Sequence, residues 1–246
     1  MKSIGIIGFG EFGQLAARHL SDRFSVGAFD ARMSVAEIEA HAARALTQSE
    51  AAACDIVMIA VPVQAMERVI AEIAPHVRAG ATVVDVASVK LLPSCWLTEY
   101  LPESVHIVPT HPLFGPQSAE RGGIAGRQLV ICPVRGEQHL KVAALGEELG
   151  LRIRITTAEE HDREMAYVQA LTHLIGRSLS MMDIPDEQLK TQTYQHLLDL
   201  TGLIGNDSFE LFTAIQTMNP FAQEVVEDFV LRAQGLLQQV NGEHRD

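Results

Sequence analysis

The chain has 246 residues, of which 47% are apolar, and a formal net charge of −12 at pH 7. This length is enough for one large domain, or for a larger and a smaller one with a sizeable core. The acidic balance argues against nucleic acid as the main partner, and no apolar run reaches the ~18 residues of a membrane span. An anionic substrate would therefore need positive charge concentrated at its site.

The cysteines and the first residues of the chain bear on the cellular compartment of the protein. Cys54, Cys95 and Cys132 are widely spaced and odd in number, which fits a reducing environment rather than a disulfide framework or a zinc site. Glu11 interrupts the opening MKSIGIIGFG early, so this stretch predicts a strand and not a signal peptide. We expect a cytoplasmic protein with no metal site, no nucleic acid and no membrane partner.

Strand-like and helical stretches alternate through the first part of the chain. The apolar runs are SIGIIG, SVGAFD, DIVMIAVP, ATVVDVAS, HIVPTHP, RQLVICPV and LRIRITT. Helical patterns such as EFGQLAARHLSDR, VAEIEAHAARAL and QAMERVIAEIAPHV separate most of them. Buried strands that alternate with helices predict a parallel sheet with helices on both faces.

After Thr157 the pattern becomes helical. AEEHDREMAYVQALTHLIGRSLSMM predicts one long helix, in which Thr157 and Glu160 have the spacing of a capping box. Further helices are expected over 186–201, 206–217 and 221–240. The sequence therefore predicts an α/β domain over 1–157, with a doubly wound, mainly parallel sheet of Rossmann type, and an all-helical C-terminal domain over 158–246.

The turn GFGEFG follows the first strand and opens the first helix. In a dinucleotide-binding turn, Gly8 would permit the sharp bend, Gly10 would let the backbone approach a diphosphate, and Gly13 would allow close packing of helix on strand. The phosphates would meet the N-terminus of the helix, which begins with Glu11 and Phe12. We place these five residues in the predicted cofactor site.

Asp30 ends the second strand, ~20 residues beyond the glycines, where a carboxylate would bind the ribose 2′-hydroxyl. The same carboxylate would repel a 2′-phosphate, so it favours NAD over NADP. Arg32 lies two residues later and leaves NADP possible.

Two further stretches end strands at the edge where such cofactors bind. We expect contacts from Val61 and Pro62 in AVPVQ and from Ser88 in DVASVK. Simpler roles are also open: Pro62 could end a strand, Ser88 could cap a turn, and Lys90 could be a surface charge.

Several motifs occur in order between residues 3 and 180, namely GFGEFG, DVASVK, THPLFGPQSA, TTAEEHD and QALTHLIGR. Together they resemble the prephenate and arogenate dehydrogenase family of tyrosine biosynthesis. The resemblance implies NAD- or NADP-dependent oxidative decarboxylation of a cyclohexadienyl carboxylate, from arogenate to tyrosine or from prephenate to 4-hydroxyphenylpyruvate. It also implies a helical domain that binds substrate and forms a homodimer.

The resemblance gives His111, in the His-Pro motif, the role of accepting the proton of the ring hydroxyl. Loss of hydride builds positive charge on the carbinol carbon, and a neutral imidazole on the hydroxyl stabilises that charge. Ser88 would bond the same hydroxyl or orient His111. A buried histidine with only a structural role is the alternative. If His111 is the base, activity should fall at acid pH.

His173, from LTH, carries over as a partner for a substrate carboxylate, with Gln169 and Thr172 as neutral donors. Gln169, His173 and Arg177 are spaced i, i+4 and i+8, so a regular helix would place them on one face. His173 would work best while charged. Arg177 could be a solvated surface residue, and His161 in EEHD is left without a role.

The chain departs from the family at an arginine that clamps a substrate carboxylate. Well-known members carry it shortly before a stretch like LLDLTGLIGNDSFELF, where this chain has Tyr194 or Gln195. The cations that could replace it are Lys190, His196, Arg121 and Arg127. Neutral groups cannot replace a bidentate arginine, whereas the ammonium group of arogenate can be held by acidic or neutral groups.

Three other functions stay open at this point. A dehydrogenase of 4-amino-4-deoxyprephenate in a secondary pathway would share nearly every motif. A 3-hydroxyacid dehydrogenase would need a lysine on the long helix, where this chain has His173 and Arg177. A non-catalytic NAD-binding sensor would need only the cofactor fingerprint, so Ser88, His111 and His173 argue against it.

Overall fold

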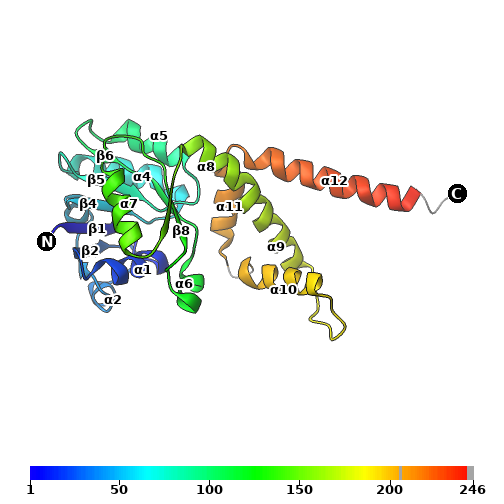
Figure 1. The fold of residues 1–246 in the computed structure, drawn as a ribbon. Coiled ribbons are helices and arrows are strands. Elements are labelled where there is room, and N and C mark those ends of the chain that lie inside the picture. Colours follow the sequence, from blue (N-terminus) through cyan, green and yellow to red (C-terminus); the bar gives the residue numbers. More distant parts are fainter. Residues whose placement is uncertain (205–206, 243–246) are drawn as a thin grey trace. The chain divides into compact units, whose positions relative to one another are not determined.

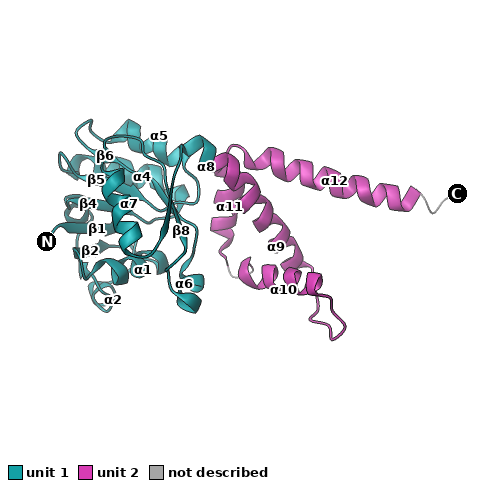
Figure 2. Ribbon diagram, in the orientation of Figure 1, with its two compact units in different colours: residues 1–161 teal, residues 162–246 magenta. Residues whose placement is uncertain are grey.

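The computed structural model describes residues 1–204 and 207–242, and the chain divides into two compact units (Figure 2). Unit 1 is Met1–His161 and unit 2 is Asp162–Asp246. The division falls inside helix α8 (Ala158–Met165), so the first turn of this helix belongs to unit 1. The boundary predicted after residue 157 coincides with the start of α8.

No helix in the described ranges has both the length and the apolar character needed to cross a membrane.

Unit 1 is built on a six-stranded parallel sheet in the order β3-β2-β1-β4-β5-β6 (Figure 1). The strands are β1 (Ser3–Ile7), β2 (Ser25–Phe29), β3 (Arg44–Ala45), β4 (Ile56–Ile59), β5 (Thr82–Asp85) and β6 (His106–Ile107). The order reverses between β1 and β4, and sheets of this kind bind ligands at that switch point, beyond the carboxyl ends of the strands. The predicted doubly wound fold is confirmed.

Amphipathic helices accompany these strands because their apolar faces complete the core. Helix α1 (Glu11–Leu20) buries Leu15, Ala17 and Leu20, and the last two join Ile4 and Ile6 of β1 in one cluster. The other helices of unit 1 are α2 (Val35–Glu39), α3 (Gln48–Ala52), α4 (Val63–Ile73), the short 3₁₀ turn η1 (Ala74–His76), α5 (Leu91–Tyr100), α6 (Pro116–Gly122) and α7 (His139–Glu148).

One predicted helix is largely wrong. VAEIEAHAARAL was expected to be helical throughout, but α2 ends at Glu39 and residues 44–45 form β3. This segment pairs with β2, and the amide of Leu46 donates to the carbonyl of Ala28 at 2.8 Å. Pairing with an available sheet edge outweighs helix propensity, which is a weak preference.

A second sheet in unit 1 has the order β7-β8-β9, with β7 antiparallel to β8 and β8 parallel to β9. Its strands are β7 (Thr110–Pro112), β8 (Gln128–Ile131) and β9 (Arg152–Ile155). The prediction of one strand over HIVPTHP is therefore wrong, because the chain leaves the first sheet at Pro109, which has no N–H to donate. RQLVICPV and LRIRITT also belong to this second sheet.

Unit 2 is helical, as predicted. The helix α8 continues through a π-helical turn η2 (Ala166–Leu171) into α9 (Thr172–Met181), followed by α10 (Gln192–Ile204), α11 (Phe209–Met218) and α12 (Ala222–Gly242). Ala170, Ile215 and Ala222 form its buried cluster. The three predicted helices correspond to α10, α11 and α12 with shifted ends, and residue 206 lies outside the described residues.

Candidate active site

The glycine turn has the geometry that a dinucleotide requires. Gly8 has a φ of +93°, and a Cβ there would lie 2.6 Å from the carbonyl oxygen of Ala60. A Cβ on Gly13 would lie 2.4 Å from the carbonyl oxygen of Gly8, so the helix and strand are in close contact. At Gly10 a Cβ would meet nothing within 4 Å. The turn therefore presents an open backbone where the diphosphate would lie.

The carboxylate of Asp30 organises the same turn. One oxygen accepts the amide of Phe9 and the other accepts the amide of Arg32, each at 2.8 Å. A carboxylate can accept about four hydrogen bonds, so Asp30 keeps capacity for a ribose hydroxyl. Arg32 is exposed, and the residues present fit a dinucleotide at this edge.

The other predicted cofactor residues lie along the carboxyl ends of β1 and β4. Glu11 is the exposed first residue of α1, whose N-cap, Gly10, makes no side-chain hydrogen bond. Phe12 is half-buried, with its ring centroid 6.3 Å from that of Phe114, so only its backbone is suited to a phosphate. Val61 is half-buried, and exposed Pro62 is the N-cap of α4. Their cofactor contacts stay predictions.

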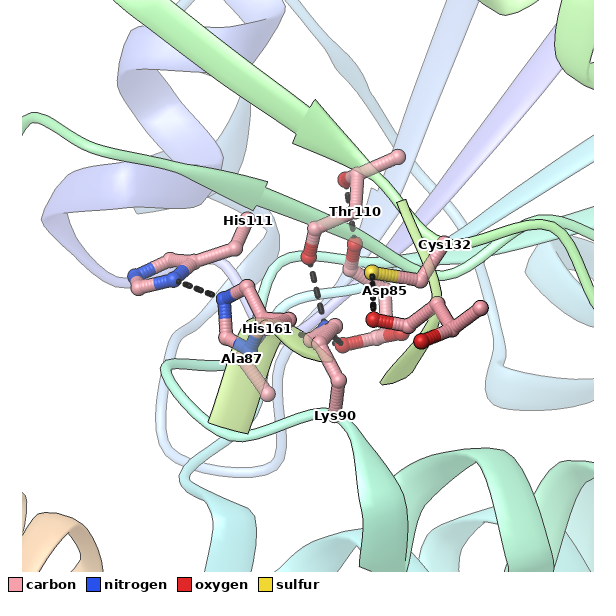
Figure 3. A network of polar contacts seen from close by, with 8 residues as sticks. Asp85, Ala87, Lys90, Thr110, His111, Cys132 and His161 are labelled. Carbon is pink, nitrogen blue, oxygen red and sulfur yellow. Dashed lines mark hydrogen bonds and ion pairs between the residues drawn. The ribbon is translucent and has the colours of Figure 1, made fainter. Parts of the chain in front are cut away.

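His111 lies in β7 and is 4% exposed. Its Nδ1 lies 2.9 Å from Nε2 of His161, and the two rings meet edge to face (Figure 3). The Nε2 of His111 does not enter this pair. If His161 accepts at its Nε2, Nδ1 of His111 carries the proton and Nε2 of His111 is an acceptor. This is the tautomer that a base for a hydroxyl proton needs.

His161 is positioned by the start of α8. The capping box predicted there is confirmed, because Glu160 N donates to the Thr157 hydroxyl at 3.1 Å and Thr157 N donates to the Glu160 carboxylate at 3.3 Å. The cap fixes the first turn of the helix, and His161 is 2% exposed.

A buried ion pair lies beside the two histidines. Lys90 and Asp85 are both 0% exposed, and the Lys90 ammonium contacts Oδ1 of Asp85. The Lys90 Nζ also donates to the carbonyl of Thr110 at 2.6 Å. The possibility that Lys90 is a surface charge is therefore excluded. Asp85 ends the buried strand TVVD.

The electrostatics of this cluster keep His111 neutral. Burial lowers the pKa of His111 well below the ordinary 6.5, and the nearby His161 and Lys90 lower it further. Burial raises the pKa of Asp85, and the Lys90 charge opposes that shift. A neutral buried imidazole is able to accept a proton, as the sequence predicted for His111.

Ser88 is half-buried and precedes the ion-pair lysine by two residues. It makes no hydrogen bond with other described residues, and the partner of His111 Nδ1 is His161. The predicted roles of Ser88 toward substrate and cofactor stay predictions.

In unit 2, His173 and Arg177 gather around Asp207. The Nδ1 of His173 is 3.7 Å from Oδ2 of Asp207, and Nη1 of Arg177 donates to the Asp207 carbonyl at 3.2 Å. The Arg177 guanidinium lies 5.0 and 5.3 Å from the ring centroids of Phe209 and Phe212. Arg177 is thus a half-buried, ordered cation, not a solvated surface residue.

The pKa values of His173 and Asp207 are both shifted by burial. Burial lowers the pKa of His173, an effect that Asp207 opposes and Arg177 reinforces. Burial also raises the pKa of Asp207. The charged form of His173 therefore needs more negative charge nearby than Asp207 supplies, such as a bound carboxylate.

The predicted stripe of side chains begins inside the π turn η2, which ends directly before Thr172. Residues four apart still lie on nearly the same face of such a turn, so the stripe through Gln169, His173 and Arg177 stays a prediction. Gln169 Oε1 and His173 Nδ1 are both buried and lack a hydrogen bond within the described residues. Buried atoms of this kind are exceptions that indicate an additional partner. Thr172 is half-buried and its donor role stays a prediction.

The alternative cations have other partners or lie on the surface. Lys190 pairs with Asp186 at 2.5 Å, His196 is 68% exposed, and Arg121 is exposed. Arg127 donates to the carbonyls of Gly123 and Ser118, so it ties down the loop around α6. Of the described cations, Arg177 is the one that lies beside His173 and Asp207.

The Lys90–Asp85 pair was not predicted from the sequence, and His161 was given no role there. A signal was present, because an aspartate that ends a fully apolar strand is buried, and a buried carboxylate requires a charged partner nearby. Lys90, five residues later, is the nearest cation along the chain.

Two sequence profiles match the chain. One, described as "Prephenate dehydrogenase, nucleotide-binding domain", matches residues 28–153. The other, described as "TYRAAT1-like, C-terminal domain", matches residues 178–246.

Curated relatives resemble the chain over most of its length. A protein of Methanocaldococcus jannaschii, described as "Probable arogenate/prephenate dehydrogenase", is 32% identical over 78% of this chain and 45% of that protein. Arogenate dehydrogenase 1, chloroplastic, of Arabidopsis thaliana is 32% identical over 95% of this chain and 38% of that protein. The chain thus spans less than half the length of these two relatives.

Solved structures share the fold. A prephenate dehydrogenase from A. aeolicus, in complex with hydroxyphenyl propionate and NAD+, has a TM-score of 0.78 at 19% identity, over 100% of this chain and 93% of that one. Synechocystis arogenate dehydrogenase has a TM-score of 0.72 at 20% identity, over 99% of this chain and 93% of that one.

Proposed function

Because the chain belongs to the prephenate dehydrogenase family, we propose that it catalyses the NAD-dependent oxidative decarboxylation of arogenate to tyrosine. The observation that carries the proposal is the buried His111, whose Nδ1 lies 2.9 Å from Nε2 of His161 and whose pKa is lowered by burial. This geometry supports a base for a hydroxyl proton. The names of the curated relatives support the reaction class.

The chemistry requires two electrons, a proton and carbon dioxide to leave the ring. When bound, an oxidised nicotinamide supplies the hydride acceptor. His111 accepts the hydroxyl proton as hydride departs from the same carbon, so no full positive charge develops there. Loss of carbon dioxide from the opposite ring carbon then makes the ring aromatic, and the proton returns to the phenolic oxygen. Ser88 would donate to the same oxygen.

NAD is the proposed cofactor rather than NADP. Asp30 ends β2 and holds its carboxylate at the glycine turn through the amide of Phe9, where it would accept the ribose 2′-hydroxyl and repel a 2′-phosphate. Gly8, Gly10 and Gly13 would hold the diphosphate.

Arogenate is the proposed substrate because unit 2 offers both signs of charge in one cluster. Arg177 and protonated His173 would hold carboxylates, with Gln169 and Thr172 as hydrogen-bonding partners. The half-buried carboxylate of Asp207 lies 3.7 Å from His173 and would attract the ammonium group of arogenate. Prephenate has a keto acid in place of this ammonium group, and a carboxylate would not attract it as an arginine would. Arg177 takes the place of the family's clamping arginine in this proposal.

A homodimer formed through unit 2 is also proposed. Leu231, Leu236, Leu237 and Val240 of α12 are 56–67% exposed, and apolar surface of this kind is typical of subunit interfaces. Cys54, Cys95 and Cys132 form no disulfide within the described residues, which supports a reducing compartment such as the cytoplasm. Light scattering of Leu236→Glu beside the parent protein tests the dimer, which this variant should weaken.

The decisive experiment measures initial rates of reduced-cofactor formation with prephenate and arogenate, each with NAD and NADP. Turnover of arogenate with NAD is the expected result. Turnover of prephenate alone would contradict the proposed role of Asp207, and turnover with NADP alone would contradict that of Asp30. An NAD-binding protein that turns over neither substrate would contradict the proposed reaction.

A further inference from the structure

We propose that Lys90 is a positioning residue that holds His111 at its working place through the carbonyl of Thr110. The Lys90 ammonium bonds that carbonyl at 2.6 Å and pairs with the carboxylate of Asp85 (Figure 3). Thr110 directly precedes His111 in β7. This inference rests on the proposed function, in which His111 is the base.

The bonds of Lys90 join the two sheets of unit 1 beyond Val108, the last residue of this segment whose amide bonds to β5. The amide of Val108 donates to Val83 of β5 at 2.9 Å, and beyond it the chain leaves the first sheet at Pro109. The next links back to β5 are side-chain bonds. The Thr110 hydroxyl donates to the Asp85 carbonyl at 2.5 Å, and the Lys90 ammonium bridges Thr110 and Asp85.

This link has a consequence for hydride transfer. The glycine turn follows β1 of the first sheet, whereas His111 belongs to the second sheet. Val84 of β5 packs with Leu129 and Ile131 of β8, and the bonds of Lys90 and Thr110 add a tie between the two sheets beside His111. A displacement of ~1 Å in a reacting group can lower a rate ~100-fold, so the tie affects catalysis directly.

The charge of Lys90 also affects the protonation of His111. Two titratable groups act on His111, namely Lys90, which follows β5, and His161 of α8. Asp85, the last residue of β5, pairs with Lys90. Both His161 and Lys90 lower the pKa of His111 in addition to burial. Lys90 therefore helps to keep His111 neutral.

Folding stability alone does not account for the pair. Replacement of a buried ion pair by well-packed neutral groups is often neutral or stabilising. Asp85 is further held by the amide of Ala87, which donates to its Oδ1 at 2.9 Å. The Ala87 amide and the Lys90 ammonium both bond to Oδ1 of Asp85. These bonds hold the Lys90 ammonium beside the Thr110 carbonyl.

The test replaces the pair by Asp85→Asn with Lys90→Met, which leaves no unpaired buried charge. We expect thermal unfolding and the Kd for NAD to stay near the parent values, while kcat falls ~10- to 100-fold. The acid limb of the rate profile and the ring titration of His111, followed by NMR, should both move to higher pH. Lys141→Met, at an exposed lysine of α7, is the control and should change neither quantity.

A parent-like kcat with an unshifted His111 titration in the double variant would overturn the inference. Thr110→Val is the milder second variant, because it removes one tie and keeps both charges. It leaves the bond from Lys90 to the carbonyl in place, so kcat should fall less than in the double variant and the titration should not move. A loss of kcat as large as in the double variant would overturn the role of Lys90. The NMR titration needs no turnover, so it still decides on Lys90 if the parent protein turns over neither substrate and the proposed reaction fails.

Discussion

The polar clusters of the two units differ in how they are completed. In unit 1, Lys90 and Oδ1 of Asp85 bond to each other, and His111 bonds to His161. Oδ2 of Asp85 is the atom of this cluster that is buried without a hydrogen bond within the described residues. In unit 2, Gln169 Oε1 and His173 Nδ1 are buried without a hydrogen bond in the described part of the chain. Groups that bind each other are preorganised for chemistry, whereas buried atoms that lack partners are suited to recognise a ligand.

The same contrast appears in the apolar residues. Unit 1 buries large side chains such as Phe9, Ile70 and Leu97 completely. Most of the exposed large apolar side chains belong to unit 2, including Met181, Met182 and Leu189. Unit 2 therefore exposes the apolar surface that the proposed homodimer would bury. Changes in unit 1 should alter the chemistry and the fold, and changes in unit 2 should alter substrate preference and association.

Loss of the base in unit 1 should have the largest effect. His111→Asn keeps a hydrogen-bonding side chain and removes the proton acceptor, so kcat should fall by a factor of ~10²–10⁴. The Kd for NAD should not change, because His111 lies outside the glycine turn. Steady-state rates and calorimetric NAD titrations measure both quantities. His76→Asn, at an exposed histidine, is the matched control, and equal losses in the two variants would contradict the assignment.

Two glycines of one turn should separate stability from cofactor binding. Gly8→Ala combines a φ of +93° with a Cβ 2.6 Å from a backbone oxygen, so the free energy of unfolding should fall by ~1–3 kcal/mol. At Gly10 a Cβ meets nothing within 4 Å, so Gly10→Ala should leave stability within ~0.5 kcal/mol and weaken NAD binding. Denaturant unfolding and NAD titration distinguish the two. A Gly10→Ala variant with parent affinity would contradict a diphosphate at this turn.

Local sequence patterns predicted many features of unit 1, but they did not predict the contacts of His111 and Lys90. The sharp bend at Gly8, the close packing at Gly13 and the capping box of Thr157 depend on residues close in sequence, and the structure has them. The cofactor contacts of the glycines and of Asp30 stay predictions. The pairing of His111 with His161 joins residues 50 apart, and the Lys90–Thr110 bond joins residues 20 apart. A hydrophobic pattern carries no information about such pairs, because they depend on where Pro109 turns the chain out of the first sheet.

The π turn of unit 2 was missed for a related reason. Its carbonyl at Ala170 accepts a hydrogen bond from Gln216 Nε2 at 2.8 Å, so a distant helix supports the altered register. No periodicity in the sequence signals this turn. Interruptions of this type often occur at functional sites.

Unit 2 should determine which substrate is used. Asp207→Asn removes the carboxylate proposed for the ammonium group, so the KM for arogenate should rise ~10-fold, the loss of one charge-assisted hydrogen bond. Activity toward prephenate should not fall. Asp186→Asn, at a carboxylate 72% exposed in the same unit, is the control. A parent-like KM for arogenate in Asp207→Asn would remove Asp207 from the proposed substrate site and leave the chemistry of unit 1 untouched.

The smallest expected effect is the loss of folding stability at acid pH, which we attribute to His111 in unit 1. The pKa of His111 is lowered in the folded chain, so below about pH 6.5 the unfolded chain binds a proton that the folded chain does not. The free energy of unfolding should therefore decrease as pH falls from 6.5, by at most ~1.4 kcal/mol per pH unit for one group. Over the same range kcat should stay near its neutral-pH value until the pH reaches the lowered pKa of His111, because the proposed base is neutral above that pKa. Thermal unfolding at several pH values, for the parent and His111→Asn, isolates this histidine. If both proteins lose stability equally on acidification, His111 is not the group that titrates, and the neutral base at the centre of unit 1 must be sought elsewhere.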